Sequence, residues 1–156
     1  VVFADGTREK IDVIIWATGY KVSFPFFKSD DLTPKANEFP LYKRIMKQGY
    51  DNLFFMGLAQ PLPTLVNLAE QQAKLVARYL AGKYAPPDMS NWPELIQHDE
   101  KLHKGHFYDS PRHTMQVDFN IYCRDLMKEI SQGEKRAAAK GESLPVSARA
   151  EAAMTQ

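Results

Sequence analysis

A continuous apolar run, Val13–Trp16, lies near the start of this 156-residue chain and leads into the segment Ala17-Thr18-Gly19-Tyr20. The run shows no alternation of apolar and polar residues, which is typical of a strand covered on both faces in a parallel α/β sheet. Gly19 permits a sharp backbone turn directly after it. Because open α/β sheets bind ligands beyond the carboxyl ends of their strands, we predict a buried strand that ends beside a ligand site.

The residues before this run predict a β-hairpin. Val1–Ala4 and Lys10–Trp16 form two extended runs, and Asp5-Gly6 lies in the turn between them. Asp-Gly is a strong hairpin signal because both of its positions favour positive φ. The chain starts inside this predicted strand, without Met and without a targeting segment, so we expect a fragment whose upstream part is missing. The alternative is a complete small domain that opens with a hairpin.

Composition is that of an ordinary globular protein, with 44% hydrophobic and 25% charged residues. The net charge of +1 gives no argument for binding to nucleic acid or to an anionic membrane. Cys123 is the single cysteine, which excludes an internal disulfide and fits a reducing compartment. No apolar run is long enough to span a bilayer. We therefore predict a cytoplasmic location, with neither nucleic acid nor a membrane as a partner.

A second strand, loop and helix follow later in the chain. Leu53–Gly57 is apolar and ends in glycine, Leu58–Thr64 is a loop with two prolines, and Leu65–Leu80 has helical spacing. The free amides and the positive dipole end at the start of such a helix stabilise negative charge. A reduced flavin carries such charge at the pyrimidine end of its ring, so Gln60, the loop backbone and the helix start are predicted to cradle that end. An ordinary turn without a ligand is the alternative.

The other segments are predicted to be loops and helices. The aromatic cluster Phe24–Phe27, inside the loop Lys21–Pro40, is expected to pack on a neighbouring surface. Leu41–Gly49 predicts a short strand that leads to a turn at Gln48-Gly49. Three helices are predicted. The first is Leu65–Leu80, with Thr64 as N-cap and Gly82 as C′ residue. The second has Ser90 or Asn91 as its cap and ends near Lys104, and the third is Phe119–Gln132.

No catalytic or metal site is predicted within the chain. His98, His103, His106 and His113 lack paired cysteines and a His-Glu-x-x-His pattern, so a metal site is not expected. Cys123 lies on the apolar face of a predicted helix, as small core residues do. The chain contains no Gly-x-Gly-x-x-Gly fingerprint, so it cannot itself be identified as dinucleotide-binding.

Three blocks of residues carry a family resemblance. The first is Phe3-x-Asp5-Gly6, then Asp12-x-x-Ile15-x-Ala17-Thr18-Gly19-Tyr20, then Phe24-Pro25-Phe26. The second is Asn52-Leu53-x-Phe55-x-Gly57-Leu58-x-Gln60-Pro61, then Glu70-x-Gln72-Ala73 and Arg78-Tyr79-Leu80-x-Gly82. The third is Gln116-Val117-Asp118-Phe119-x-x-Tyr122. In order and spacing these blocks, over about residues 1–132, resemble the carboxyl-terminal part of flavin-containing monooxygenases.

The resemblance implies an α/β fold, namely the C-terminal part of a Rossmann-like flavoprotein with two dinucleotide-binding domains, for FAD and for NADPH, and a helical C-terminal extension. Residues 1–20 would be a hairpin and an interdomain linker strand returning from the NADPH domain, and 21–84 the C-terminal part of the FAD domain. Residues 85–132 would be the helical extension. Beyond the resemblance, the chain from Gly133 is rich in Ala, Glu and Lys and loses its periodicity, so its composition predicts a disordered tail over 133–156. The implied cofactor-binding residues are Thr18, Gly19, Gly57, Gln60, Pro63 and Thr64. Leu58 stands where many related flavoproteins have Asp, which shifts the expected flavin contact to backbone groups and Gln60.

The implied activity is that of an FAD- and NADPH-dependent monooxygenase of the N,N-dimethylaniline type. Such enzymes use O₂ and a flavin C4a-hydroperoxide to oxygenate an amine nitrogen or a sulfur of a small nucleophile. The cofactor does this chemistry, so no catalytic residue is expected here, and the fragment by itself is expected to be inactive.

Two other classes of protein remain open. One comprises Baeyer–Villiger and N-hydroxylating flavin monooxygenases and flavin disulfide reductases, the last of which would need a redox cysteine pair. The other is a non-catalytic truncated remnant that serves as an interaction module. The sequence also leaves the substrate and the oligomeric state, including a homodimer, open.

Overall fold

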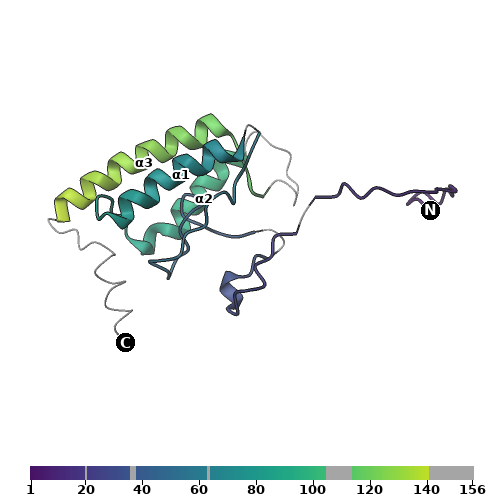
Figure 1. Ribbon diagram of the computed structural model, residues 1–156, viewed down its shortest axis with the longest axis horizontal. Coiled ribbons are helices and arrows are strands. Elements are labelled where there is room, and N and C mark those ends of the chain that lie inside the picture. The colour runs from purple at the N-terminus through teal and green to yellow at the C-terminus, as the bar shows by residue number, and fades with distance from the viewer. Residues whose placement is uncertain (20, 36–37, 63, 105–113, 141–156) are drawn as a thin grey trace.

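A computed structural model of the chain describes residues 1–19, 21–35, 38–62, 64–104 and 114–140, and shows three helices with an arm that extends away from them (Figure 1). In chain order the elements are the 3₁₀-helix η1 (Asp30–Leu32), strand β1 (Gln60–Pro61), helix α1 (Leu65–Leu80), the 3₁₀-helix η2 (Met89–Asn91), helix α2 (Trp92–Lys104), strand β2 (Gln116–Val117) and helix α3 (Phe119–Lys140). Helix α1 packs along α3. The fold is therefore mixed but mostly helical.

Helix α1 has the bounds that its apolar spacing predicts. Its inner face buries Leu68, Gln72, Leu75 and Val76. Gly82 follows the helix with φ +69°, as predicted for a C′ residue. Its amide bonds the carbonyl of Tyr79 at 3.0 Å, and the Lys83 amide bonds that of Arg78 at 2.8 Å. These two bonds form a Schellman motif that satisfies the last carbonyls of the helix.

Aspartate side chains cap η2 and α3. The carboxylate of Asp88 accepts the Ser90 amide at 2.9 Å and caps η2, which leads directly into α2. Helix α2 begins at Trp92, directly after the predicted cap position Asn91, and Ser90 lies inside η2. The carboxylate of Asp118 accepts the Ile121 amide at 2.9 Å and caps α3. Helix α2 ends at Lys104 and α3 begins at Phe119, as predicted.

Helix α3 does not stop at Gln132. It continues to Lys140, so the expectation of a disordered tail is wrong for residues 133–140, while 141–156 lie outside the described residues. Gly133 is buried against the ring of Tyr84, and Arg136 donates to the carbonyl of Ala85 at 2.9 Å. The segment after α1 thus supplies the packing that holds this last part of α3 in place.

Two clusters of buried side chains form the core. The larger lies between the helices and includes Tyr42 stacked on Trp92, with ring centroids 4.9 Å apart. The smaller consists of Leu32, Phe39, Leu41, Phe55 and Met115, and the half-buried rings of Phe24 and Phe27 pack against it. The predicted packing of the 24–27 segment is confirmed for Phe24 and Phe27, whereas Phe26 is exposed.

Among the described residues, β-sheet structure is limited to one sheet of two short strands. Strands β1 and β2 pair in parallel, with Gln60 opposite Gln116. The predicted strand in the first part of residues 41–49 is wrong, because Tyr42 and Met46 instead face each other across a tight turn, with 2.8 Å between the Tyr42 amide nitrogen and the Met46 carbonyl oxygen. The predicted turn at Gln48-Gly49 is confirmed: Gly49 has φ +89°, and the Tyr50 amide donates to the Lys47 carbonyl at 3.2 Å. Met46 then forms an isolated bridge with Phe54, so the expected strand over 53–57 is reduced to a single pairing.

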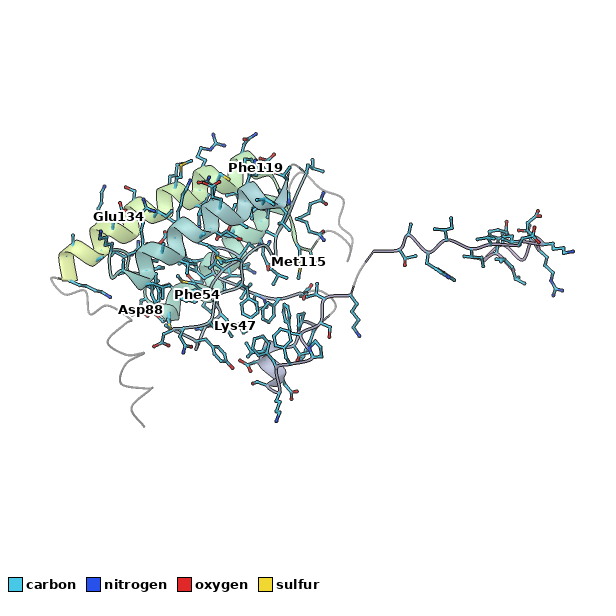
Figure 2. All side chains as sticks on the ribbon, in the orientation of Figure 1. Lys47, Phe54, Asp88, Met115, Phe119 and Glu134 are labelled. Atoms are coloured by element: carbon cyan, nitrogen blue, oxygen red, sulfur yellow. The ribbon has the colours of Figure 1, made fainter. Side chains whose placement is uncertain are left out.

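The N-terminal arm confirms the hairpin and corrects the buried strand. Val2 pairs with Arg8 in antiparallel fashion around Gly6, which has φ +85°, so the second side of the hairpin starts before Lys10. Ile15 and Trp16 are 86% and 79% exposed. The arm that contains them extends away from the helices (Figure 2). A strand of this composition is buried only between neighbouring strands and helices, and no described residue of the chain supplies them for 13–16.

Candidate functional site

The loop between Gly57 and α1 is held at two points. Gly57 has φ +74°, and its amide donates to the side-chain carbonyl of Gln72 at 2.8 Å. The Gln60 amide donates to the carbonyl of Met115 at 2.8 Å, just before β2. The loop backbone therefore has a fixed position relative to α1 and to the β1–β2 pair.

The start of α1 is open to a negatively charged group. Thr64 is the N-cap, as predicted, but its side chain makes no capping hydrogen bond, and the first turn contains no acidic residue. The first helical amides therefore retain their donor capacity, and the helix dipole adds positive potential. Thr64 and Gln60 are both exposed at this end.

Four exposed apolar side chains come from the loop, from the residue before it and from the first turn of α1. This apolar rim consists of Met56, Leu62, Leu65 and Val66, with Leu62 80% and Val66 77% exposed. A flat apolar ring with one electron-rich edge would cover such a rim and place that edge at the helix start. A flavin is a ligand of this kind.

The structure gathers some of the predicted cofactor-binding residues and separates others. Gly57, Gln60 and Thr64 lie on one loop at the start of α1. Thr18 and Gly19 lie on the exposed arm, which extends away from the helices (Figure 1). Pro63 lies outside the described residues. Their role in cofactor binding stays a prediction.

A buried hydrogen-bond network behind the loop is the feature that sequence reasoning missed. The Gln72 side-chain amide donates to the Tyr122 hydroxyl at 2.8 Å, and that hydroxyl donates to the Lys43 carbonyl at 2.7 Å. Gln72 and Tyr122 are both almost fully buried. The signal in the sequence was a glutamine at an inward position of an apolar helix face, but its partners lie far away along the chain.

A group of charges continues from this network. The ammonium of Lys43 lies 2.7 Å from a carboxylate oxygen of Asp125 and 3.0 Å from one of Asp99. Burial alone would lower the pKa of Lys43, but the two carboxylates outweigh it and raise that pKa. Burial also raises the pKa of Asp99, against the effect of Lys43. Nearby, burial and the charge of Arg44 lower the pKa of His103 to about 4, so this imidazole is neutral at pH 7.

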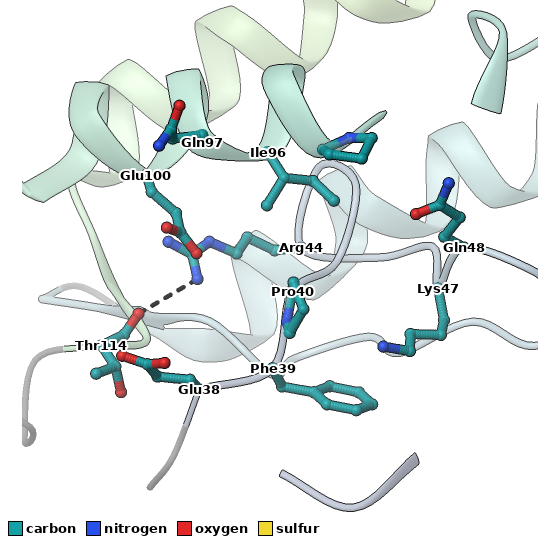
Figure 3. Close-up of a pocket in the computed structure, with 11 residues that line it drawn as sticks. Glu38, Phe39, Pro40, Arg44, Lys47, Gln48, Ile96, Gln97, Glu100 and Thr114 are labelled. Atoms are coloured by element: carbon teal, nitrogen blue, oxygen red, sulfur yellow. Dashed lines mark hydrogen bonds between the residues drawn. The ribbon is translucent and has the colours of Figure 1, made fainter. Parts of the chain in front are cut away.

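A cavity of about 430 Å³ opens between the 38–48 segment and α2 (Figure 3). Arg44 reaches into this region, and its Nη1 donates to the Thr114 carbonyl at 3.2 Å. Glu38, Lys47 and Glu100 also line the cavity, so both signs of charge are present. None of its lining residues belongs to the Gly57–Thr64 loop. The cavity is therefore separate from the predicted cofactor site.

The four histidines considered as metal ligands in the sequence analysis differ in their surroundings. His98 is exposed and His103 is buried, while His106 and His113 lie outside the described residues. Over the part of the chain that the structure describes, no group of three or more His, Cys, Asp or Glu residues could hold a metal ion. No described helix combines the length and the apolar character needed to cross a bilayer.

Comparison with known proteins decides the family. The model of the flavin-binding monooxygenase-like family matches residues 1–136. This chain belongs to that family. The resemblance inferred from the three sequence blocks is thereby confirmed, and with it a flavin-binding protein of Rossmann type in coarse outline.

Curated relatives agree with this assignment. The chain is 36% identical to flavin-containing monooxygenase 5 of Oryctolagus cuniculus over 134 residues, covering 83% of this chain and 24% of the relative. It is 37% identical to flavin-containing monooxygenase 2 of Homo sapiens over 133 residues, covering 83% and 25%. Dimethylaniline monooxygenase [N-oxide-forming] 2 of Macaca mulatta is 36% identical over 133 residues, with the same coverage. The chain thus spans about a quarter of the length of these relatives.

Proposed function

We propose that this chain is the C-terminal part of an FAD- and NADPH-dependent monooxygenase that oxygenates an amine nitrogen or a sulfur of small soft nucleophiles. Family membership supports the flavin, and the names of the relatives support the monooxygenase type. NADPH, O₂ and the substrate class belong to the proposal. Within it, residues 21–84 complete the FAD domain and 85–140 form its helical extension.

The observation that carries the proposal is the open end of α1. The start of α1 has no side-chain capping hydrogen bond and no acidic residue in its first turn, and the apolar rim lies in and beside the Gly57–Thr64 loop. Backbone groups of this loop and the side chain of Gln60 would hold the flavin ring there. FAD, when bound, supplies the activation of O₂ for transfer to the substrate. The residues of this chain bind and orient the ring, and the apolar rim excludes water from its edge.

The exposed arm has a place in the same proposal. Ile11–Gly19 presents large apolar side chains to solvent, which in a native protein marks a surface that another part covers. As a linker between the NADPH and FAD domains, the arm would be covered by their strands. Thr18 and Gly19 would then form the part of the cofactor pocket wall that comes from the linker.

The test is performed on the protein in its native length. We expect the purified protein to carry flavin, with its visible absorption, and to oxidise NADPH in the presence of N,N-dimethylaniline with formation of the N-oxide. Gln60→Ala should weaken FAD binding. Gln132→Ala, which changes an exposed glutamine on α3, is the matched control and should bind FAD like the unmodified protein.

A protein that binds no FAD would refute the proposal. Bound FAD and NADPH oxidation with oxygenation only of ketones would favour the Baeyer–Villiger alternative. Equal FAD affinities for the two glutamine variants would remove Gln60 from the site.

A further inference from the structure

A single buried side chain connects the loop beside the proposed flavin site to the helical core. Gln72 lies on α1 with no measurable solvent exposure. A buried primary amide is costly unless its oxygen and nitrogen both find partners. Here the oxygen accepts from the Gly57 amide at 2.8 Å, and the nitrogen donates to the Tyr122 hydroxyl at 2.8 Å.

The direction of this chain of hydrogen bonds is fixed. The Gly57 amide can only donate, so the carbonyl oxygen of Gln72 must face it. The Lys43 carbonyl can only accept, so the Tyr122 hydroxyl must donate to it and must accept from Gln72. No alternative orientation of the Gln72 amide satisfies both ends.

This series of hydrogen bonds ends, on both sides, at a residue whose backbone conformation is strained or unusual. Gly57 turns with φ +74° at the start of the loop, and Lys43 has φ +51° in the tight turn Tyr42–Met46. A left-handed conformation costs free energy in a residue such as lysine, and persists only when its surroundings hold it. The Tyr122 hydroxyl at the Lys43 carbonyl, on a side chain that is 2% exposed, is such a constraint.

Helix α1 therefore acts on the loop twice. Its N-terminal end faces the proposed flavin site, and its inner face holds the Gly57 amide through Gln72. With this bond, the loop is ordered before any ligand arrives. Without it, ligand binding would have to supply the free energy of ordering the loop and would weaken accordingly.

We infer that Gln72, supported by Tyr122, is the positioning residue of the flavin-facing loop, and that it sets FAD affinity by holding Gly57 rather than by touching the cofactor. This inference rests on the function proposed above, because it needs FAD to bind at the loop. It assigns a role to two residues that contact no predicted ligand group and lie outside the predicted site.

The test compares three variants of the native-length protein. Gln72→Met removes the hydrogen bonds of the Gln72 side chain at nearly constant volume, including a long one of 3.5 Å to the Arg44 carbonyl. Tyr122→Phe removes the hydroxyl that orients Gln72 and bonds the Lys43 carbonyl. Tyr84→Phe is the matched control, because its hydroxyl is also buried and donates to Glu129 at 2.8 Å but has no contact with the loop. Thermal unfolding gives the stability of each variant, and flavin fluorescence titration gives the dissociation constant for FAD.

We expect Gln72→Met to weaken FAD binding by about tenfold, as the loss of one well-made hydrogen bond would, and to shift the visible flavin spectrum. Tyr122→Phe should weaken it by about threefold, and Tyr84→Phe by less than about twofold even if all three lower the unfolding temperature. Amide hydrogen exchange of the apoprotein should be faster at Gly57 in Gln72→Met but unchanged in Tyr84→Phe.

Equal losses of FAD affinity in Gln72→Met and Tyr84→Phe would overturn the inference, since both would then act through general stability. If Gln72→Met does not fold, unchanged FAD affinity and exchange in Tyr122→Phe would overturn it. An unmodified protein that binds no FAD would refute the proposed function, and the inference with it, and is distinguished from the other outcomes by that missing binding.

Discussion

Gly133→Ala should destabilise the fold, although the same change inside a helix normally stabilises it. Alanine is favoured over glycine in helix interiors by about 1 kcal/mol. At Gly133, however, an added Cβ would lie 2.1 Å from two ring carbons of Tyr84, far inside the carbon–carbon contact distance of about 3.5–4.0 Å. Something must move for the methyl group to fit.

The Tyr84 ring has little freedom to move. Its side chain is 3% exposed, its hydroxyl bonds Glu129 at 2.8 Å, and the neighbouring Ala85 amide bonds the Gly133 carbonyl at 3.0 Å. Overpacking of this kind costs about 1–3 kcal/mol, and a rigid ring places the cost at the upper end. After the gain in helix propensity is subtracted, we expect a net loss of about 2 kcal/mol in the free energy of unfolding.

Urea unfolding followed by circular dichroism measures this loss. Ser131→Ala, at an exposed position two residues earlier in α3, is the control and should be neutral or slightly stabilising. In the double variant Gly133→Ala/Tyr84→Ala, the cost of the added methyl group should vanish because the ring is gone. A Gly133→Ala protein as stable as the unmodified one would refute the reasoning, since it would mean that the ring yields freely.

Three further changes test other parts of the fold. Lys43→Met should lower the free energy of unfolding by roughly 3 kcal/mol, because it leaves the carboxylates of Asp99 and Asp125 without their cation, and Lys43→Met/Asp99→Asn should recover part of that loss in the same urea experiment. The pKa of His103 is lowered to about 4 in the folded state, so below its ordinary pKa the folded protein binds fewer protons at this site than the unfolded protein does. The contribution of His103 to stability should therefore fall as the pH drops from about 6.5 to 4 and be constant above. His103→Gln should reduce this pH dependence, whereas His98→Gln, at an exposed site, should not. Asp118→Ala should cost about 1 kcal/mol of thermal stability through loss of the α3 cap, and no loss would contradict the capping role of its carboxylate.

The helices were predictable because their signals are local. The apolar spacing of Leu65–Leu80 and the glycine at position 82 describe an element whose hydrogen bonds all lie within a few residues. The hairpin at Asp5-Gly6 is equally local. Family membership was also predictable, because three separate blocks kept the family's order and spacing.

The errors concern features that depend on distant partners. Val13–Trp16 has the composition of a buried strand but finds no strand beside it among the described residues. The turn at Lys43 and Arg44 has φ values of +51° and +57°, which lysine and arginine seldom adopt, so the residue types at these positions did not indicate a turn. The extension of α3 past Gln132 depends on Tyr84, which lies far earlier in the chain.

The candidate site was predictable in part for the same reason. Gly57, Gln60 and Thr64 follow one another along the chain, so the strand–loop–helix pattern placed them together. The hydrogen bond from Gln72 to Tyr122 joins residues 50 positions apart in the sequence, and the bond from Tyr122 to Lys43 joins residues 79 positions apart. No local sequence pattern can indicate such contacts.

In helix α1 and the turn that follows it, insertions and deletions should be tolerated less well than substitutions. The helix carries Gln72 in its middle and ends in the Gly82 turn that delivers Tyr84 to Gly133. One inserted or deleted residue between Gln72 and Gly82 would rotate everything beyond it by about 100°, which would turn Tyr84 away from α3 or Gln72 away from Tyr122. Exposed positions such as Lys74 and Ala77 can exchange side chains without this effect. Among natural variants of this segment, substitutions should therefore be frequent on the outer face of α1, and single-residue insertions or deletions between Gln72 and Gly82 should be rare.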